Sequence, residues 1–210
     1  MFIKICGTTN LTDAALAVSL GVDALGFVFA ESKRQVDAPT VANIVKELPR
    51  SMMTVGVVRN ASVDEILKIF RETKLSAIQL HGHEGPEVSK ALRSEVPFLI
   101  QAFTADDPRL AQLREYDIDA ILLDSPTPGS GETFDWSRIS DLPHRFRVIL
   151  AGGLNPTNIA EAIAGVGPWG VDVVSGVEAE PGRKDPVALT EFVGLARDAL
   201  SEFSTDPTQA

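Results

Sequence analysis

The single cysteine of this chain, Cys6, ends a short apolar segment and stands directly before a glycine turn. A helical pattern begins by Leu11, so we expect the thiol to be partly exposed and close to helix amides. Both conditions favour a reactive thiolate, although a lone cysteine in an apolar strand more often only fills core space. Cys6 is a candidate reactive group whose role depends on its neighbours.

A second candidate is Asp124, which follows three large apolar residues. Its carboxyl group is expected to be desolvated and to hold a proton near neutrality, while the simpler alternative is that it caps the following turn. A thiol and a carboxyl group supply one general base and one general acid, a pair suited to moving a proton within a sugar phosphate. A nucleophilic triad is not indicated, because neither His81 nor His83 has a matching Ser or Cys context.

Two glycine-rich turns follow apolar segments late in the chain, one at Gly152-Gly153 and one at Ser175-Gly176. Glycine lets backbone amides approach an anion closely, and a helix N-terminus adds a favourable dipole. Tight turns also need glycine for their own sake, but two such turns in adjacent units favour phosphate binding. Gly152, Gly153, Ser175 and Gly176 are therefore the predicted phosphate-binding residues.

Short apolar segments alternate with helical patterns along the whole chain, and this alternation must position the candidate residues. Strands are expected near residues 2–6, 24–29, 53–58, 76–80, 97–102, 119–124, 146–151 and 171–175. Helices are expected near residues 11–20, 39–48, 62–73, 84–94, 107–115, 134–141, 156–164 and 186–203. Eight such units predict an α/β protein with a closed (β/α)8 TIM barrel. The C-terminal strand ends of such barrels carry the active face, and Cys6, Asp124 and the glycine turns all fall there.

A weak internal repeat supports the strand count. The segments that share it are Val22-Asp23-Ala24, Ile118-Asp119-Ala120, Val171-Asp172-Val173 and, more loosely, Leu75-Ser76-Ala77. The repeat predicts that all four open an even-numbered strand, as expected for a barrel built from four double units.

Composition limits the partners and the compartment. A net charge of −10 argues against nucleic acid and membrane surfaces, so an anionic ligand must be held by local donors. One cysteine suits a reducing cytoplasm, and neither a signal peptide nor a membrane-spanning run is indicated. We expect one catalytic domain over residues 1–203, a disordered tail over residues 204–210, and a monomer or homodimer.

Lys4 and the histidines need separate interpretations. Strand alternation puts Lys4 beside Cys6 on one face, so the ammonium points into the barrel and needs a carboxylate partner that the sequence does not identify. Its charge favours a lower pKa for the Cys6 thiol, and direct catalysis by Lys4 is not expected. The segment His81-Gly82-His83-Glu84 lacks a third clear metal ligand, so we expect a hydrogen-bonded loop histidine, a helix-start Glu84 and no metal.

Taken together, these residues resemble the phosphoribosylanthranilate isomerase family of tryptophan biosynthesis. The resemblance runs from Lys4 to about Asp185. The matching segments are Lys4-Ile5-Cys6-Gly7, Gly26-Phe27-Val28-Phe29, Gln79-Leu80-His81-Gly82, Leu122-Leu123-Asp124, Gly129-Ser130-Gly131, Phe134-Asp135-Trp136, Leu150-Ala151-Gly152-Gly153-Leu154, Ser175-Gly176-Val177-Glu178 and Pro181-Gly182-Arg183-Lys184-Asp185.

The resemblance implies a cofactor-free Amadori rearrangement of a small phosphorylated substrate, N-(5-phosphoribosyl)anthranilate. It implies that Cys6 is the general base at the sugar C2, that Asp124 is the general acid at the ring oxygen, and that Arg34 holds the anthranilate end. A guanidinium suits both a carboxylate and an aromatic face. Two positions depart from the family pattern: Lys33 adds a second cation beside Arg34, and Val174 stands where serine is common.

Other functions remain as alternatives. A histidine-pathway phosphoribosyl isomerase would carry a carboxylate at the position of Cys6, and indole-glycerol-phosphate synthase would carry a catalytic-lysine motif and an N-terminal extension. A non-catalytic phosphate-binding barrel is the alternative from a different class, because the fold alone does not exclude it. The presence of both Cys6 and Asp124 favours an active enzyme.

Overall fold

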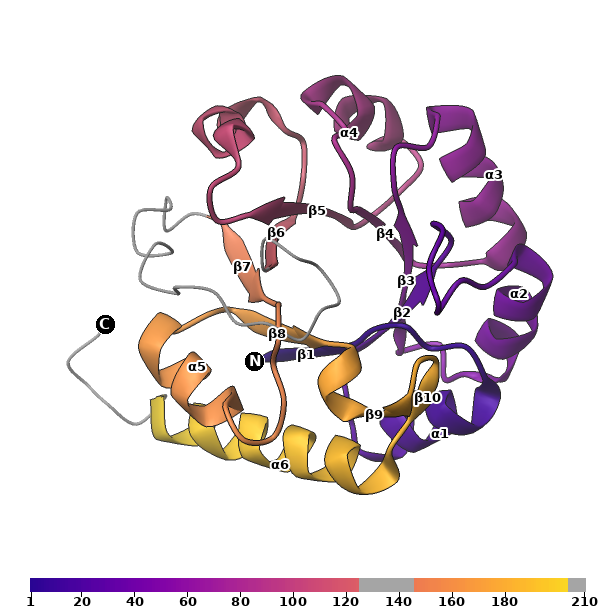
Figure 1. Ribbon diagram of the computed structural model, residues 1–210. Helices are drawn as coiled ribbons and strands as arrows, with labels where there is room; N and C mark the ends of the chain where they lie inside the picture. The colour runs from indigo at the N-terminus through magenta and orange to yellow at the C-terminus, as the bar shows by residue number, and fades with distance from the viewer. Residues whose placement is uncertain (125–145, 204–210) are drawn as a thin grey trace.

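A closed barrel of eight parallel strands forms the centre of the molecule, as the computed structural model shows for the described residues 1–124 and 146–203 (Figure 1). The strands pair in chain order, and β8 pairs back onto β1. They are β1 (Phe2–Ile5), β2 (Ala24–Val28), β3 (Met53–Val58), β4 (Ala77–Leu80), β5 (Leu99–Thr104), β6 (Ala120–Asp124), β7 (Arg147–Leu150) and β8 (Gly170–Val173). The predicted TIM barrel is confirmed.

Helices surround this ring of strands (Figure 1). They are α1 (Leu11–Ser19), α2 (Ala38–Glu47), α3 (Val63–Thr73), α4 (Pro86–Leu92), α5 (Ile159–Val166) and α6 (Pro186–Phe203), with 3₁₀ helices η1 (Pro108–Glu115) and η3 (Ser175–Val177). A small hairpin of β9 (Glu178–Glu180) and β10 (Arg183–Lys184) follows η3. None of the helices in these described ranges is long and apolar enough to cross a membrane.

Several helix boundaries follow from capping residues visible in the sequence. Ser62 and Glu65 form a reciprocal capping box at the start of α3. Asp185 accepts hydrogen bonds from the backbone amides of Val187 and Ala188, and Pro186 opens α6. The expected helix at residues 107–115 is instead the 3₁₀ helix η1, broken at Gln112. The expected helix at 134–141 and the expected tail at 204–210 lie outside the described residues.

The apolar core has two layers, one inside the barrel and one between strands and helices. Ile3 and Ile5 of β1 face the helices and pack in the outer layer with side chains of α1 and α6. Lys4, between them, faces the barrel interior and is fully buried. Strand alternation therefore places Lys4 as predicted, and it puts the next inward position, Cys6, at the end of β1.

The internal repeat corresponds to a structural device in three of its four copies. Asp23, Ser76 and Asp119 precede β2, β4 and β6, and each side chain accepts a backbone amide hydrogen bond at the start of the preceding strand. The prediction was wrong for the remaining copy, Val171-Asp172-Val173. Asp172 lies inside β8, which begins at Gly170, and its side chain faces Lys4 instead.

Candidate active site

Cys6 lies directly after β1, where its backbone amide donates to the carbonyl of Val173. The thiol is buried, with 4% of the residue exposed, so the expected partial exposure was wrong. Gly26 of β2 packs against it so closely that an added Cβ would lie 2.6 Å from Sγ. Burial raises the pKa of the Cys6 thiol, and the charges of Lys4 and Lys184 offset this only in part. The expected lowering of the thiol pKa by Lys4 is therefore outweighed by desolvation.

The partner that Lys4 needs is Asp172, whose Oδ1 lies 2.8 Å from Nζ inside the barrel. Burial acts to lower the pKa of Lys4, but Asp172 and Cys6 hold it above its ordinary value. Burial raises the pKa of Asp172. The floor of the site, inside the barrel, is therefore a buried ion pair. Such a pair needs good geometry because neither charge is solvated.

Asp124 ends β6 on the same end of the barrel and is 9% exposed. His81, after β4, places Nε2 3.4 Å from Asp124 Oδ2, and Gln79 Nε2 lies 2.8 Å from His81 Nδ1. Because the Gln79 amide nitrogen can only donate, Nδ1 of His81 is the acceptor and Nε2 is the ring nitrogen that faces Asp124. The predicted hydrogen-bonded loop histidine is confirmed, but its position facing Asp124 is not part of that prediction. Strand alternation from Gln79 to His81 was the signal that could have placed it inward.

The two glycine turns lie against each other and against Asp124. Gly152 and Gly153 adopt φ of 83° and 68°, a region that favours glycine. At Gly176 an added Cβ would lie 2.0 Å from the carbonyl oxygen of Leu154, so only glycine permits this approach of the two turns. A small cavity of about 30 Å³ is bounded by both turns; its lining includes Asp124, Gly152, Gly153, Asp172 and Ser175. The structure thus brings the predicted acid and the predicted phosphate turns together.

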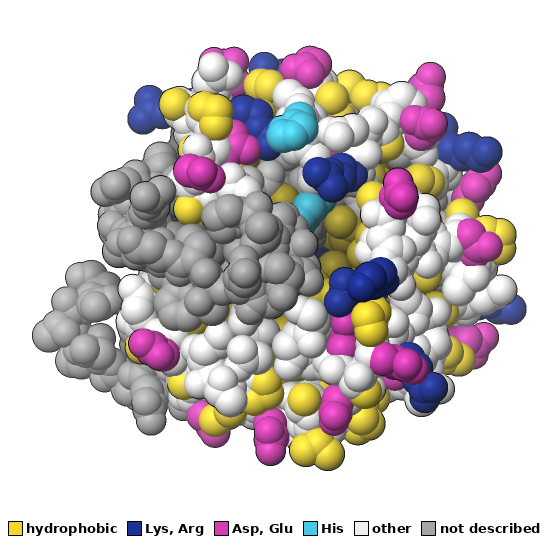
Figure 2. Space-filling model, viewed as in Figure 1, with side chains coloured by type: hydrophobic (Ala, Val, Ile, Leu, Met, Phe, Trp, Pro, Cys, Tyr) yellow, Lys and Arg dark blue, Asp and Glu magenta, His cyan; other side chains and the backbone are white. Residues whose placement is uncertain are grey.

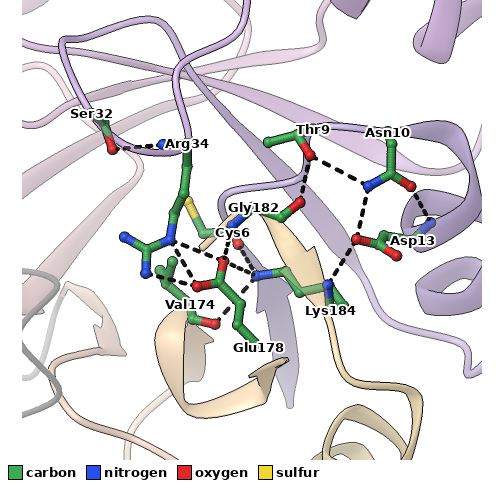
Figure 3. A network of polar contacts seen from close by, with 10 residues as sticks. All are labelled: Cys6, Thr9, Asn10, Asp13, Ser32, Arg34, Val174, Glu178, Gly182 and Lys184. Atoms are coloured by element: carbon green, nitrogen blue, oxygen red, sulfur yellow. Dashed lines mark hydrogen bonds and ion pairs between the residues drawn. The ribbon is translucent and has the colours of Figure 1, made fainter. Parts of the chain in front are cut away.

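Arg34, in the loop after β2, points toward the end of β8 and not into open solvent (Figure 3). Its Nε and Nη2 donate to the Glu178 carboxylate at 2.9 and 2.7 Å. Glu178 also lies 3.2 Å from Lys184 Nζ. Lys33 is exposed, whereas Arg34 is held at the barrel mouth. The sequence interpretation had assigned no role to Glu178 or Lys184.

The loop after β4 does not have the expected helix-start glutamate. Helix α4 begins at Pro86, and the buried Glu84 instead accepts hydrogen bonds from the amides of Asn60 and Gly82. Glu84 thereby ties the loops after β3 and β4 together. Among the described residues there is no group of three or more His, Cys, Asp or Glu side chains placed to hold a metal ion.

A wider pocket of about 210 Å³ opens beside Asp124 on this side of the barrel. Its lining includes His81, Arg59, Phe103 and Arg109. Figure 2 shows the histidine side chains on this face, next to Lys and Arg side chains. Arg109 is paired with Asp107 at 2.6 Å and lies over the Phe103 ring, so the pocket combines an aromatic wall with guanidinium groups.

The chain that forms this site matches a known protein family over most of its length. Residues 3–194 match the family model of N-(5'-phosphoribosyl)anthranilate (PRA) isomerase. The chain belongs to the PRA isomerase family. The PRA isomerase of Pelobacter propionicus is 42% identical over 206 residues, covering 95% of this chain and 97% of the relative.

Solved structures agree with the PRA isomerase assignment. The Thermotoga maritima enzyme superposes with a TM-score of 0.87 at 42% identity, covering 94% of this chain and 99% of that chain. A PRA isomerase in complex with reduced 1-(o-carboxyphenylamino)-1-deoxyribulose 5-phosphate gives a TM-score of 0.85 at 40% identity, again with 94% and 99% coverage. The family segments at Gly129-Ser130-Gly131 and Phe134-Asp135-Trp136 fall outside the described residues.

Proposed function

We propose that this chain isomerises N-(5-phosphoribosyl)anthranilate to 1-(2-carboxyphenylamino)-1-deoxyribulose 5-phosphate, an Amadori rearrangement in tryptophan biosynthesis. The observation that carries the proposal is the family match over residues 3–194, which includes Cys6, Asp124 and both glycine turns at one barrel end. The relative solved with a reduced form of this product supports the same substrate class.

In the first step, Asp124 gives its proton to the furanose ring oxygen. The C1–O bond then breaks, and the lone pair of the anthranilate nitrogen forms a C1=N iminium. The pocket beside Asp124, with its phenylalanine and arginine side chains, offers room for the opened sugar chain. A positioned proton donor of this kind contributes roughly 10²–10⁴-fold to the rate.

In the second step, Cys6 acts in its thiolate form, after its thiol proton has passed to solvent, and removes the proton at C2. The C2–H electron pair forms a C1=C2 double bond, and the C1=N pair returns to nitrogen. Transfer of the proton from the resulting enol oxygen to C1 then gives the ketose. The iminium draws electrons from C2, so the proton is acidic enough for a thiolate base held near it.

The remaining residues bind the substrate. Gly152, Gly153 and Ser175 line the small cavity next to Asp124, and Gly176 packs against the first turn at Leu154. Together the two turns supply backbone amides for the phosphate without a basic cluster. Arg34 meets the anthranilate end. The steps leave Asp124 ionised and Cys6 protonated, and exchange of one proton with water restores both groups for the next turnover. The proposal includes neither cofactor nor metal.

The test is turnover of freshly made phosphoribosylanthranilate by purified, metal-stripped protein, followed as loss of anthranilate fluorescence. We expect rapid loss with the wild-type chain and a loss at least about 10²-fold slower with Cys6→Ala. A folded wild-type protein that leaves the fluorescence unchanged would contradict the proposal. Binding of ribose 5-phosphate in that case would favour another phosphoribosyl substrate or a non-catalytic barrel.

The proposed setting is the cytoplasm, with the chain as a monomer or a homodimer. The Thermotoga maritima relative is described as dimeric, and monomers of it have been crystallised. Light scattering on the purified chain distinguishes the two states.

A further inference from the structure

Lys184 is a buried lysine at the barrel mouth that the proposed chemistry does not use. Its side chain is 1% exposed, and its ammonium lies within hydrogen-bond distance of three oxygens, one from each of three segments (Figure 3). These are the carbonyl of Cys6 at 2.7 Å, the carbonyl of Val174 at 3.2 Å and Glu178 Oε1 at 3.2 Å. An ammonium has three donors, so this environment satisfies it fully.

Glu178 connects this lysine to Arg34. Its carboxylate accepts from Nε and Nη2 on one edge of the guanidinium, in the two-pronged geometry that fixes the guanidinium plane. The Nη1 group of Arg34 makes no hydrogen bond to the residues that the structure describes, so it remains for a ligand. The three side chains carry two positive charges and one negative charge, so the cluster keeps a net charge of +1 toward an anionic ligand.

Contacts with the loop after β1 hold this cluster in place independently of any ligand. The backbone amide of Lys184 donates to Asp13 in the first turn of α1. At the hairpin tip, the Thr9 hydroxyl donates to the carbonyl of Gly182, whose amide lies 3.3 Å from Glu178 Oε1. The hairpin is therefore attached to the segment that follows Cys6.

We propose that Lys184 and Glu178 form one positioning unit: Lys184 holds the backbone at Cys6, and Glu178 orients Arg34. The unit sets the base and the anthranilate-binding guanidinium at a fixed separation before substrate arrives. The assignment of the ligand rests on the proposed function, whereas the positioning of Cys6 does not.

An effect of charge alone and an effect of positioning predict opposite changes in ligand affinity for Glu178→Gln. The substitution removes the negative charge, so electrostatics alone would tighten binding of an anionic ligand. If Glu178 orients Arg34, the same change weakens binding, because the guanidinium loses the carboxylate that fixes its plane. Because hydrogen bonds to charged groups are among the strong ones, we expect the affinity for the ligand to fall about tenfold or more.

The experiment titrates the reduced product analogue and ribose 5-phosphate into wild type and Glu178→Gln. We expect affinity for the analogue to fall about tenfold, with ribose 5-phosphate unchanged because it lacks the anthranilate end. In an Arg34→Ala background, Glu178→Gln should change nothing further. Equal or tighter binding of the analogue by Glu178→Gln overturns the proposal. Glu95→Gln, which breaks the exposed Arg71–Glu95 ion pair, is the matched control.

The link to Cys6 is tested without substrate, by the rate of Cys6 alkylation with iodoacetamide. Lys184→Met should change the rate of alkylation severalfold, because the Cys6 carbonyl loses the ammonium that lies 2.7 Å from it. The same variant should lower kcat as well as raise KM. Urea unfolding shows whether the Lys184→Met protein is folded. An unchanged alkylation rate in the folded variant contradicts the proposal that Lys184 positions Cys6. If this variant does not fold, the ligand titration of the nearly isosteric Glu178→Gln variant tests the proposal by itself. A wild-type chain without turnover contradicts only the proposed function.

Discussion

The two sides of the barrel mouth are built differently. On the thiol side, around β1 and β8, the residues Cys6, Lys4 and Lys184 are buried. The Glu178 side chain is only 3% exposed, and the charged groups are paired within the protein. On the acid side, around β4 to β6, Asp124 borders a pocket of about 210 Å³ and the His81 side chain is 23% exposed. Packed protein charges surround the proposed base, Cys6, whereas the proposed acid, Asp124, borders open space that a ligand can enter.

Removing either reacting group should have the largest effect on activity. We expect Cys6→Ala and Asp124→Asn each to lower kcat by about 10²–10⁴-fold, because each supplies one proton-transfer partner. Steady-state turnover by fluorescence measures this, and circular dichroism establishes that the variants fold. Retention of most activity by either variant would remove that residue from its assigned role.

Crowding the thiol side should lower activity almost as much as removing the thiol. The new methyl group of Gly26→Ala would lie 2.6 Å from Cys6 Sγ and 3.1 Å from Lys4 Nζ, so both groups must move. A displacement of this kind should lower kcat/KM about 10- to 100-fold. The matched control is Gly165→Ala, where an added Cβ meets nothing within 4 Å. Equal activity of the two alanine variants would show that the thiol position is not critical.

The acid side should tolerate change better. His81→Phe removes the group 3.4 Å from Asp124 but leaves the pocket open to solvent. We expect kcat to fall about tenfold with KM nearly constant, because one orienting hydrogen bond is worth roughly 1–2 kcal/mol. Gln79→Leu should have a smaller effect in the same direction. A change confined to KM would instead make His81 a binding residue.

The smallest expected effect concerns stability against acid. Burial acts to raise the pKa of Glu178, but Arg34 and Lys184 hold it below the ordinary value of 4.5. The stability from ionised Glu178 is complete above pH 4.5 and is lost as the pH falls through the lower folded-state pKa. In urea unfolding from pH 6 to pH 3, the free energy of unfolding should decline less for Glu178→Gln than for the wild-type chain. Parallel declines would contradict this.

Local patterns predicted the fold well. The apolar segments predicted eight strands close to their observed bounds, because parallel strands covered on both faces need continuous apolar runs. Ser62 with Glu65, and Asp185 with Pro186, predicted two helix starts through contacts only a few residues apart. The repeat was misread at Asp172, because an aspartate before an apolar residue looks the same at a strand start and inside a strand.

The candidate site was predicted only in part. Cys6, Asp124 and the glycine turns could be placed at one barrel end, since strand order alone determines which ends meet. The burial of Cys6 and the roles of His81, Glu178 and Lys184 could not be seen, because each depends on a side chain from a distant strand or loop.

The sequence by itself determined the strand and helix periods, the inward direction of Lys4 and Cys6, and the glycine positions, all of which follow from local backbone geometry. Only the tertiary structure decided which charges meet. Lys4 pairs with Asp172 across 168 positions, Lys184 reaches the Cys6 carbonyl across 178, and Arg34 reaches Glu178 across 144. Closure of β8 onto β1 brings these groups together, and desolvation then makes their pairing obligatory.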